Sequence, residues 1–291
     1  MTIQRIYQAL IVTAALTLAA GCDKIEPSDD GTYTVYAGAV GESEEGAALA
    51  DHTHRVWIEK YTGPRCNNCP TADDVIHDIL EQESYRDNVV ATAIHATNVF
   101  GYPLDNSPDL RIEAGEDWCQ FFFGGNAEFP QVLLNRQREG NGFNVISPIS
   151  PFTSAIDEIV QSPADVAIEV KAHFDSQSGS LTITPAIELL SDLPGAITLT
   201  VLFVEDSLVA GQRMPDGTTN PAYVHNHVLR GLVTDKWGAD VDCELTSGTT
   251  RKVTFKSTLP QGCVMANCQV VAFVSDKSSR SIYNVASCPI N

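Results

Sequence analysis

Residues 55–80 read RVWIEKYTGPRCNNCPTADDVIHDIL, and this stretch decides the fold class of the chain. Its first seven residues are rich in β-branched and aromatic side chains and predict a strand that ends at Gly63-Pro64. Pro70 suits the first turn of the helix that follows, in which apolar side chains recur at helical spacing. Cys66 and Cys69 therefore lie between a strand and a helix, which is the position that a redox-active Cys-x-x-Cys pair requires.

The segment around this stretch continues to alternate between strand and helix signals. We expect strands at residues 89–95 and 131–135 and helices at residues 109–123 and 150–161. Ser150 would be the N-cap of the last helix. Strands separated by helices favour an α/β domain with parallel neighbours, which we expect over residues 54–162.

The pattern changes after Ser162-Pro163. From residue 166 to residue 174 every second side chain is apolar (Val166, Ile168, Val170, Ala172 and Phe174), and turns containing Gly or Pro separate further short strands. Short alternating strands with frequent turns predict an all-β domain. We therefore expect a two-sheet, immunoglobulin-like sandwich over residues 163–291.

The N-terminus predicts export and lipid attachment. Residues 9–20 form an apolar stretch that is too short to span a bilayer but has the length of a signal-peptide core. It ends in Leu-Ala-Ala-Gly-Cys22, which resembles the lipobox of bacterial lipoproteins, so we expect a signal peptide at residues 1–21 and lipidation of Cys22. A plain secretory signal or an uncleaved anchor is the alternative. Residues 22–53 are acidic and contain glycine, which predicts a flexible tether.

Charge and hydropathy limit the partners. The formal net charge is −19, and such a surface repels nucleic acid and anionic lipid, so neither is an expected partner. Beyond the N-terminus the sequence predicts no membrane-spanning segment, so the lipid alone would attach the chain. Export permits disulfides, and seven of the eight cysteines remain when Cys22 is set aside.

The position of the Cys pair suggests its chemistry. At a helix N-terminus, free N–H groups and the dipole would stabilise the Cys66 thiolate, which makes Cys66 the nucleophile and Cys69 the resolving thiol. His95 ends a buried strand and is a candidate base, with a hydrogen-bonded structural histidine as the alternative. A structural disulfide is the alternative for the pair itself. No organic cofactor is implied, and zinc is not expected, because no second set of Cys or His residues stands at ligand spacing.

Residues 61–70 resemble the active-site turn of thioredoxin-like proteins. Phe129-Pro130, just before a predicted strand, resembles their cis-proline, which implies that Pro130 faces the pair and orients an extended substrate chain. Two positions depart from the family pattern, because Arg65 replaces the usual tryptophan and Lys60 replaces the buried acid. Glu59 is adjacent to Lys60, but strand alternation directs it to the opposite face.

Four cysteines of the β segment predict disulfides. Cys268 and Cys288 flank a predicted hairpin and lie opposite each other when residues are counted outward from its turn. Cys243 would then pair with Cys263, although the other pairings of these four stay open. Cys119 stands among aromatic residues and is expected to be a small buried apolar residue.

Two further histidines could hold a metal. His225 and His227 share one face if their segment is a strand, and Glu205 or Asp206 would complete the ligand set. Packing or hydrogen bonding is the favoured alternative for both.

A narrower resemblance covers most of the chain. The matching segments are residues 59–63, the Cys pair, and residues 93–95, 129–130, 204–206 and 223–230. Together they resemble the lipoproteins related to outer membrane protein 28. That family joins a thioredoxin-like domain to a β domain, and the resemblance implies a lipid-anchored protein of the bacterial cell envelope, with the outer membrane favoured.

Two functions follow as hypotheses. The first is thiol–disulfide exchange with extracytoplasmic proteins through mixed disulfides. The second is a non-enzymatic outer-membrane or surface lipoprotein with a structural disulfide and a β domain that binds partners. The reduction potential of the pair separates them, because a structural disulfide lies below about −300 mV and a redox catalyst between about −120 and −270 mV.

Overall fold

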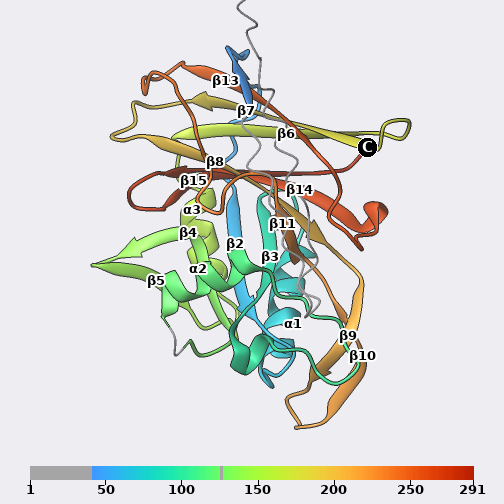
Figure 1. Cartoon of the computed structure of the whole chain (residues 1–291). Helices are drawn as coiled ribbons and strands as arrows, with labels where there is room; N and C mark the ends of the chain where they lie inside the picture. The colour runs from blue at the N-terminus through green and yellow to red at the C-terminus, as the bar shows by residue number, and fades with distance from the viewer. Residues whose placement is uncertain (1–40, 125–126) are drawn as a thin grey trace, which may run out of the picture.

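The computed structural model describes residues 41–124 and 127–291. In this part of the chain the protein is mostly β-sheet with few helices, arranged like a β-sandwich (Figure 1). Cys22, the signal peptide at residues 1–21 and most of the expected tether lie outside the described residues. Within the described ranges, no helix has the length and apolar character needed to cross a membrane.

The larger sheet of the described chain has nine strands. They are β2 (Val56–Thr62), β3 (Val89–His95), β4 (Gln131–Glu139), β5 (Gly142–Ile146), β8 (Ile197–Glu205), β11 (Val228–Leu232), β12 (Ala239–Asp240), β14 (Cys268–Asp276) and β15 (Ile282–Pro289). The order is β15-β14-β8-β11-β3-β2-β4-β5, and β12 pairs with β8. β3 is parallel to both β2 and β11, while the other pairs are antiparallel. One sheet therefore contains strands from both halves of the chain.

Helices cover both faces of the β3-β2-β4 part of this sheet. They are α1 (Cys69–Leu80), α2 (Glu113–Phe123) and α3 (Thr153–Val160), with short helical turns η1 (Thr97–Gly101) and η2 (Met265–Asn267) elsewhere. α1 and α3 bury Ile76, Ile79 and Ile156 in one apolar cluster with residues of β2, β3 and β4. Trp118 of α2 lies in a second cluster with Trp57. Apolar stripes at helical spacing therefore fix each helix on its face.

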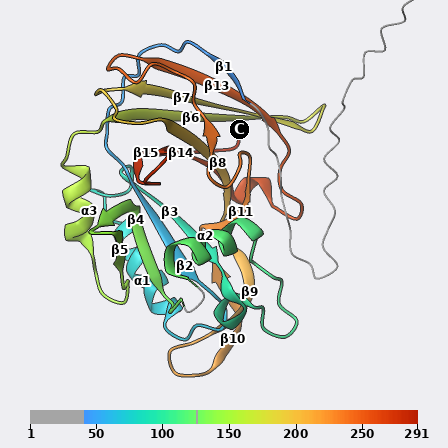
Figure 2. The ribbon, with the colours of Figure 1, turned by 60° about the vertical axis from the view of Figure 1, so that its left-hand side comes forward.

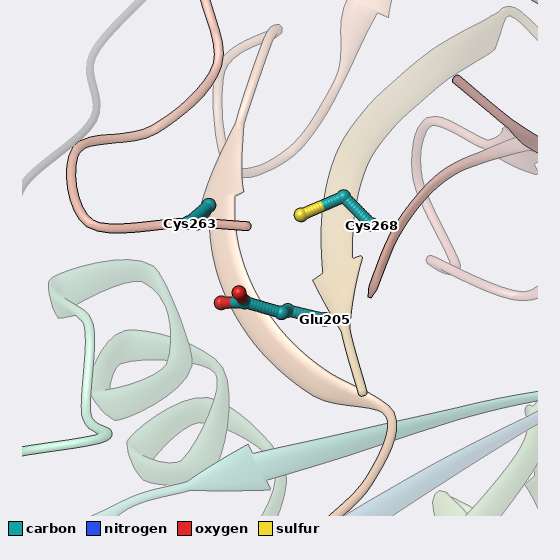
Figure 3. A group of neighbouring side chains, drawn as sticks. All are labelled: Glu205, Cys263 and Cys268. Carbon is teal, nitrogen blue, oxygen red and sulfur yellow. The ribbon is translucent and has the colours of Figure 1, made fainter. Parts of the chain in front are cut away.

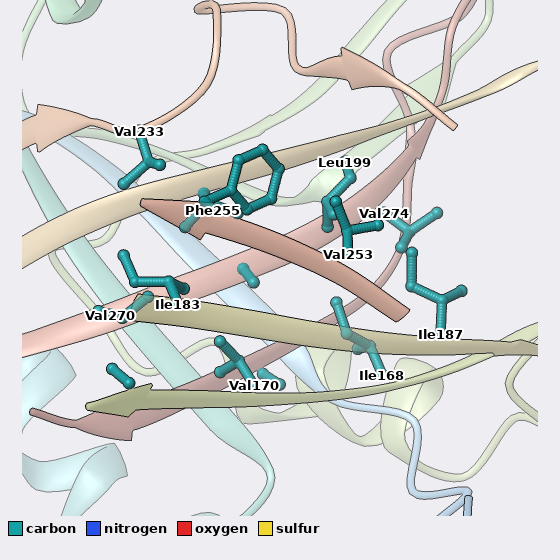
Figure 4. Packing of buried hydrophobic residues seen from close by; sticks show 14 of the residues in the cluster. Ile168, Val170, Ile183, Ile187, Leu199, Val233, Val253, Phe255, Val270 and Val274 are labelled. Carbon is teal, nitrogen blue, oxygen red and sulfur yellow. The ribbon is translucent and has the colours of Figure 1, made fainter. Parts of the chain in front are cut away.

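A second, four-stranded sheet forms the other layer of the sandwich. Its order is β1 (Glu42–Glu44), β13 (Thr250–Ser257), β7 (Ser180–Leu189) and β6 (Val166–Asp175). Figure 2 shows it stacked on the β15-β14-β8 part of the larger sheet. Apolar side chains from both layers, such as Ile183 and Phe255 from one and Leu199 and Val274 from the other, interdigitate between them (Figure 4). Alternation is strict along β7 and gives it one buried face, while β6 alternates only after Ile168, since its first three residues are all buried.

The other face of the larger sheet brings together side chains from both halves of the chain. Trp57 of β2 stacks on Phe273 of β14 with ring centroids 4.6 Å apart, although three strands separate β2 from β14 in the sheet. Leu202, Val271 and Val285 join the same cluster. The expected boundary at residue 162 thus falls between α3 and β6, while the sheet and its core continue across it.

The structure corrects the end of the expected tether at residues 22–53. Residues 42–44 form β1, which pairs with β13 at the edge of the smaller sheet. Leu49 donates its N–H to Glu188 Oε2 at 2.6 Å, and Gly46 accepts a hydrogen bond from Thr250 Oγ1 at 2.9 Å. Backbone pairing therefore orders a segment whose composition alone predicts a flexible chain.

Candidate functional site

Cys66 and Cys69 form a disulfide in the turn between β2 and α1. Cys69 is the first residue of α1, and Cys66 lies before the helix, where its N–H donates to Gly63 O at 3.0 Å. The Phe129–Pro130 peptide bond is cis, and Phe129 belongs to the same apolar cluster as both cysteines. The pair thus sits between a strand and a helix and packs beside the residue that precedes Pro130.

The disulfide is closed off from solvent. Cys66 is 2% exposed and Cys69 is 0% exposed. The sequence hypothesis of a nucleophilic Cys66 requires a sulfur that another polypeptide can reach. This burial is the first difference between the expected redox site and the observed one.

A hairpin from the second half of the chain covers the turn that carries the disulfide. It consists of β9 (Leu208–Arg213) and β10 (Thr219–His225), which lie beside α1 in Figure 1. The Gln212 side-chain amide, 1% exposed, donates to Cys66 O at 2.9 Å. Arg213 N–H donates to Pro64 O at 2.8 Å, and Asn67 Nδ2 donates to Met214 O at 3.2 Å. Hydrogen bonds on both sides of Cys66 therefore hold the hairpin in place.

Arg65, which replaces the usual tryptophan, is hydrogen-bonded to a neighbouring loop. Its guanidinium donates to Tyr102 O and Pro103 O, each at 3.0 Å. Its N–H donates to Phe100 O at 2.9 Å, so the 97–103 segment is bonded to the turn. Arg65 therefore holds this loop against the turn, and its guanidinium is hydrogen-bonded to two carbonyl oxygens of the loop.

Lys60, in the place of the buried acid, is paired on the α1 side of the sheet. Lys60 is 3% exposed and forms an ion pair with Asp73 of α1. Tyr223 of β10 donates to the same carboxylate at 3.1 Å, which links the hairpin to α1. Burial raises the pKa of Tyr223, with the Asp73 carboxylate adding to the effect, so this hydroxyl stays a donor. A cavity of 310 Å³ opens beside this triad, between α1, β3 and β10.

His95, the candidate base, packs against His225. The two rings meet edge to face with centroids 5.2 Å apart, and both residues are buried. Burial is the main reason that the pKa of His95 lies well below its usual value, and burial also lowers the pKa of His225 to about 4. Both imidazoles are therefore neutral at neutral pH.

These two histidines predict a loss of stability in mild acid. The unfolded chain binds protons at both imidazoles as the pH falls below about 6.5, whereas the folded chain does not. Stability therefore falls between about pH 6.5 and pH 4, by on the order of 3 kcal/mol from His225 alone. We expect His225→Gln to reduce the shift in urea midpoint between about pH 7.5 and pH 4.5. An equal shift in the variant and the parent would contradict this assignment.

Glu59 points to the face opposite Lys60, as strand alternation predicts, and forms a buried ion pair there. Arg136, 2% exposed, donates from Nε and Nη2 to the two Glu59 oxygens at 2.8 and 2.7 Å. Tyr61 donates its hydroxyl to Glu59 at 2.6 Å. Five rings surround the guanidinium carbon at centroid distances of 4.8 to 6.0 Å, namely Trp57, Trp118, Phe122, Trp237 and Phe273. This charge is satisfied inside the protein and belongs to the core.

The cysteines of the second half of the chain do not form the favoured disulfides. Cys288 lies opposite Val270, and Cys268 lies instead beside Cys263, so the expected Cys268–Cys288 bridge is absent from the described structure. Cys243 is also a free thiol. Cys119 is buried as expected, and burial raises the pKa of its thiol to about 12, which makes it unreactive.

The metal site expected at His225 and His227 is also not formed, because the two histidines have different neighbours. His227 pairs with Asp206 through Nδ1 at 3.0 Å, while His225 faces His95. β10 ends at His225, and His227 follows it with a φ of 58°, so the two residues do not lie on one strand as the expected site requires. Hydrogen bonding and packing, the favoured alternative, account for both residues.

Together these features define the class of protein: a mostly β, sandwich-like protein with a buried Cys-x-x-Cys disulfide covered by its own second half. The chain belongs to the family described as outer membrane protein Omp28, whose family model matches residues 123–291. This membership confirms the predicted location in the cell envelope at the outer membrane.

Two solved structures illustrate what this chain is similar to. HBP35 of Porphyromonas gingivalis is 17% identical, with a TM-score of 0.61 over 83% of this chain and 77% of that one. A domain of the outer membrane lipoprotein Omp28 from Porphyromonas gingivalis is 23% identical, covering 44% of this chain and 89% of that one with a TM-score of 0.31. No curated protein matches this chain.

Proposed function

We propose that this chain is a non-enzymatic, lipid-anchored outer-membrane or surface lipoprotein that binds extracytoplasmic partners through its β-rich half. In this proposal Cys66–Cys69 is a structural disulfide that fastens the turn between β2 and α1. The observation that carries the proposal is the burial of both cysteines beneath the β9–β10 hairpin.

The chemistry of exchange supports this choice. A thiolate must reach a disulfide sulfur to form a mixed disulfide, and access is one of the factors that set the rate. Here the sulfurs lie in an apolar cluster, and Gln212 and Arg213 bond the hairpin to the backbone of the turn. Lys60 is ion-paired where an exchange enzyme of this kind would hold a free acid. Each feature favours a closed disulfide.

We further propose that residues 54–162 form a thioredoxin-like unit that has become part of a larger sheet. Support comes from parallel β2 and β3, antiparallel β4 and β5, and helices on both faces. The cis bond before Pro130 also fits. In such a unit the substrate position beside Pro130 and Cys66 would be taken by the protein's own hairpin.

Turnover assays test the proposal. We expect the mature chain to reduce insulin and to reactivate scrambled ribonuclease no faster than the Cys66→Ser/Cys69→Ser double variant. A Cys69→Ala trap produced in the envelope should yield no disulfide-linked partner, while non-covalent partners captured by the mature chain should be retained by the double variant. Turnover above the double variant, or a recovered mixed disulfide, would establish the exchange function instead.

Weakening the hairpin should expose the disulfide. Gln212→Ala removes the donor to the buried Cys66 carbonyl, and an unsatisfied buried group costs about 1–3 kcal/mol. We expect native-state reduction of Cys66–Cys69 by a soluble dithiol to become about tenfold faster or more, because opening becomes easier by that free energy. Val224→Thr, at a position on the same hairpin that is 49% exposed, is the control and should leave the rate unchanged. Equal rates for all three proteins would show that the hairpin does not protect the pair.

A further inference from the structure

A second cluster of reactive side chains lies on the β-rich half of the chain, where β8 ends and β14 begins. Glu205 is the last residue of β8, Cys268 is the first of β14, and the two are register partners. Side chains of directly opposed residues in an antiparallel pair stand on the same face, with Cβ atoms about 4.5–5.5 Å apart. The sheet itself therefore places a carboxylate beside a thiol.

The loop between β13 and β14 brings a second thiol to the same place. Val264 donates its N–H to Glu205 Oε1 at 2.7 Å, and Asp206 donates its N–H to Asn267 O at 3.0 Å. These bonds fold residues 258–267 back over the strand end and hold Cys263 against Cys268. A Glu205 oxygen and the two sulfur atoms all lie within 4.8 Å of one another. Figure 3 shows Glu205, Cys263 and Cys268 gathered where the loop meets the two strands.

Glu205 retains coordination capacity that its neighbours do not use. It is 1% exposed, its Oε2 lies 3.4 Å from Arg230 Nε, and this oxygen accepts no hydrogen bond from the described residues. A carboxylate has about four lone-pair sites, and the Val264 N–H, the Arg230 ion pair and the neighbouring Cys263 thiol occupy only part of them here. A buried oxygen beside two thiols therefore has room for a further positive partner.

Two thiolates and one carboxylate match the preferences of zinc. Tetrahedral zinc with Zn–S near 2.3 Å and Zn–O near 2.1 Å sets its donor atoms about 3.6–3.8 Å apart. Donors already within 4.8 Å need only small side-chain movements to reach that geometry. Soft thiolates disfavour calcium and magnesium, which take oxygen ligands.

The charges also balance. With both thiols protonated, the Glu205 carboxylate and the Arg230 guanidinium sum to zero. Binding of Zn²⁺ releases two thiol protons to solvent, so that three negative ligands, one guanidinium and one dication again sum to zero. Arg230 then becomes the outer-shell partner that orients the ligating carboxylate. Zinc binding therefore leaves no net charge buried at the end of β8.

We propose that Glu205, Cys263 and Cys268 form a zinc site with a fourth position open to water or to a donor from a partner. Cys263 is only partly buried, which gives the ion an entry path from the loop side. The competing outcome is a Cys263–Cys268 disulfide. It would leave Glu205 Oε2 facing two sulfurs that have no hydrogen to donate.

Cobalt titration of the mature chain tests the site. The chain carries Cys22→Ser in place of the lipid, is reduced without denaturant and is stripped of metal with a chelator. We expect one equivalent of Co²⁺ to produce thiolate-to-cobalt charge-transfer absorption, which one equivalent of Zn²⁺ abolishes. Zinc should also raise the melting temperature, because it binds the folded state.

Variants assign the ligands. Cys263→Ser or Cys268→Ser should abolish the absorption, and Glu205→Gln, which keeps the acceptor for Val264, should weaken binding at least about tenfold. Cys243→Ser/Cys288→Ser is the matched control and should bind as the parent does. A folded parent without the absorption, or absorption that persists in folded Cys268→Ser, would overturn the proposal. So would a Cys263–Cys268 disulfide found by peptide mapping in protein isolated from the envelope.

Discussion

Arg136→Met should destabilise the protein by about 3–5 kcal/mol, because it leaves the Glu59 carboxylate buried without its counter-charge. The Glu59 side chain is fully buried, and two hydrogen bonds from Arg136 neutralise it. Methionine keeps much of the apolar stem but supplies no donor. Urea unfolding followed by tryptophan fluorescence measures the change.

A double variant separates charge from packing. Glu59→Gln on the Arg136→Met background removes the unpaired carboxylate charge, and the glutamine oxygen can still accept the Tyr61 hydroxyl. We therefore expect the double variant to recover part of the lost stability. Arg138→Met is the control, since Arg138 is exposed over the Phe143 ring, and should cost less than about 1 kcal/mol. A loss of unfolding free energy below about 1 kcal/mol for Arg136→Met would show that the Glu59–Arg136 ion pair contributes little to stability.

Phe273→Ala should cost about 3–5 kcal/mol and weaken both halves of the chain together. Phe273 lies on β14, but its ring stacks on Trp57 of β2 and faces the Arg136 guanidinium. Removing it opens a cavity between residues from opposite ends of the sequence. We expect a single unfolding transition, shifted equally for tryptophan fluorescence and for far-ultraviolet circular dichroism.

The matched control for this variant is Phe255→Ala. Phe255 is equally buried but packs in the sandwich core, in a cluster whose members among the described residues begin at Val166. Combined with Trp57→Ala, Phe273→Ala should show a coupling energy of about 0.5–1.5 kcal/mol, and Phe255→Ala should be additive. Two separate transitions, or equal coupling for both phenylalanines, would mean that the halves fold independently.

Local patterns in the sequence predicted the elements that depend on near neighbours. The strand expected at residues 55–61 is β2 at Val56–Thr62, and the helix expected at residues 70–82 is α1 at Cys69–Leu80. Period-two alternation likewise predicted β6 and β7. Helix starts were less exact, since the helix expected from residue 150 begins at Thr153 and Phe152 is its N-cap.

Long-range partners could not be predicted from one sequence. Gln212 lies 146 residues from Cys66, and nothing in its local sequence marks it as the donor that closes the disulfide. Arg136 likewise has no local signal, because its five aromatic neighbours come from four separate segments of the chain. The predicted Cys268–Cys288 pairing was wrong for a different reason. Next to the turn Ser275 pairs with Ile282, which is already one position away from the register that the count assumes, and an irregularity between Val274 and Ser275 adds a second position and sets Cys288 opposite Val270.

The central claim is that the β9–β10 hairpin buries Cys66–Cys69 and that this disulfide is structural. The reduction potential of the pair in the folded mature chain tests this claim most directly. Equilibration with glutathione and dithiothreitol buffers should give a potential below about −300 mV. A potential between about −120 and −270 mV, reached while the chain remains folded, would contradict the claim and assign the pair to thiol–disulfide exchange.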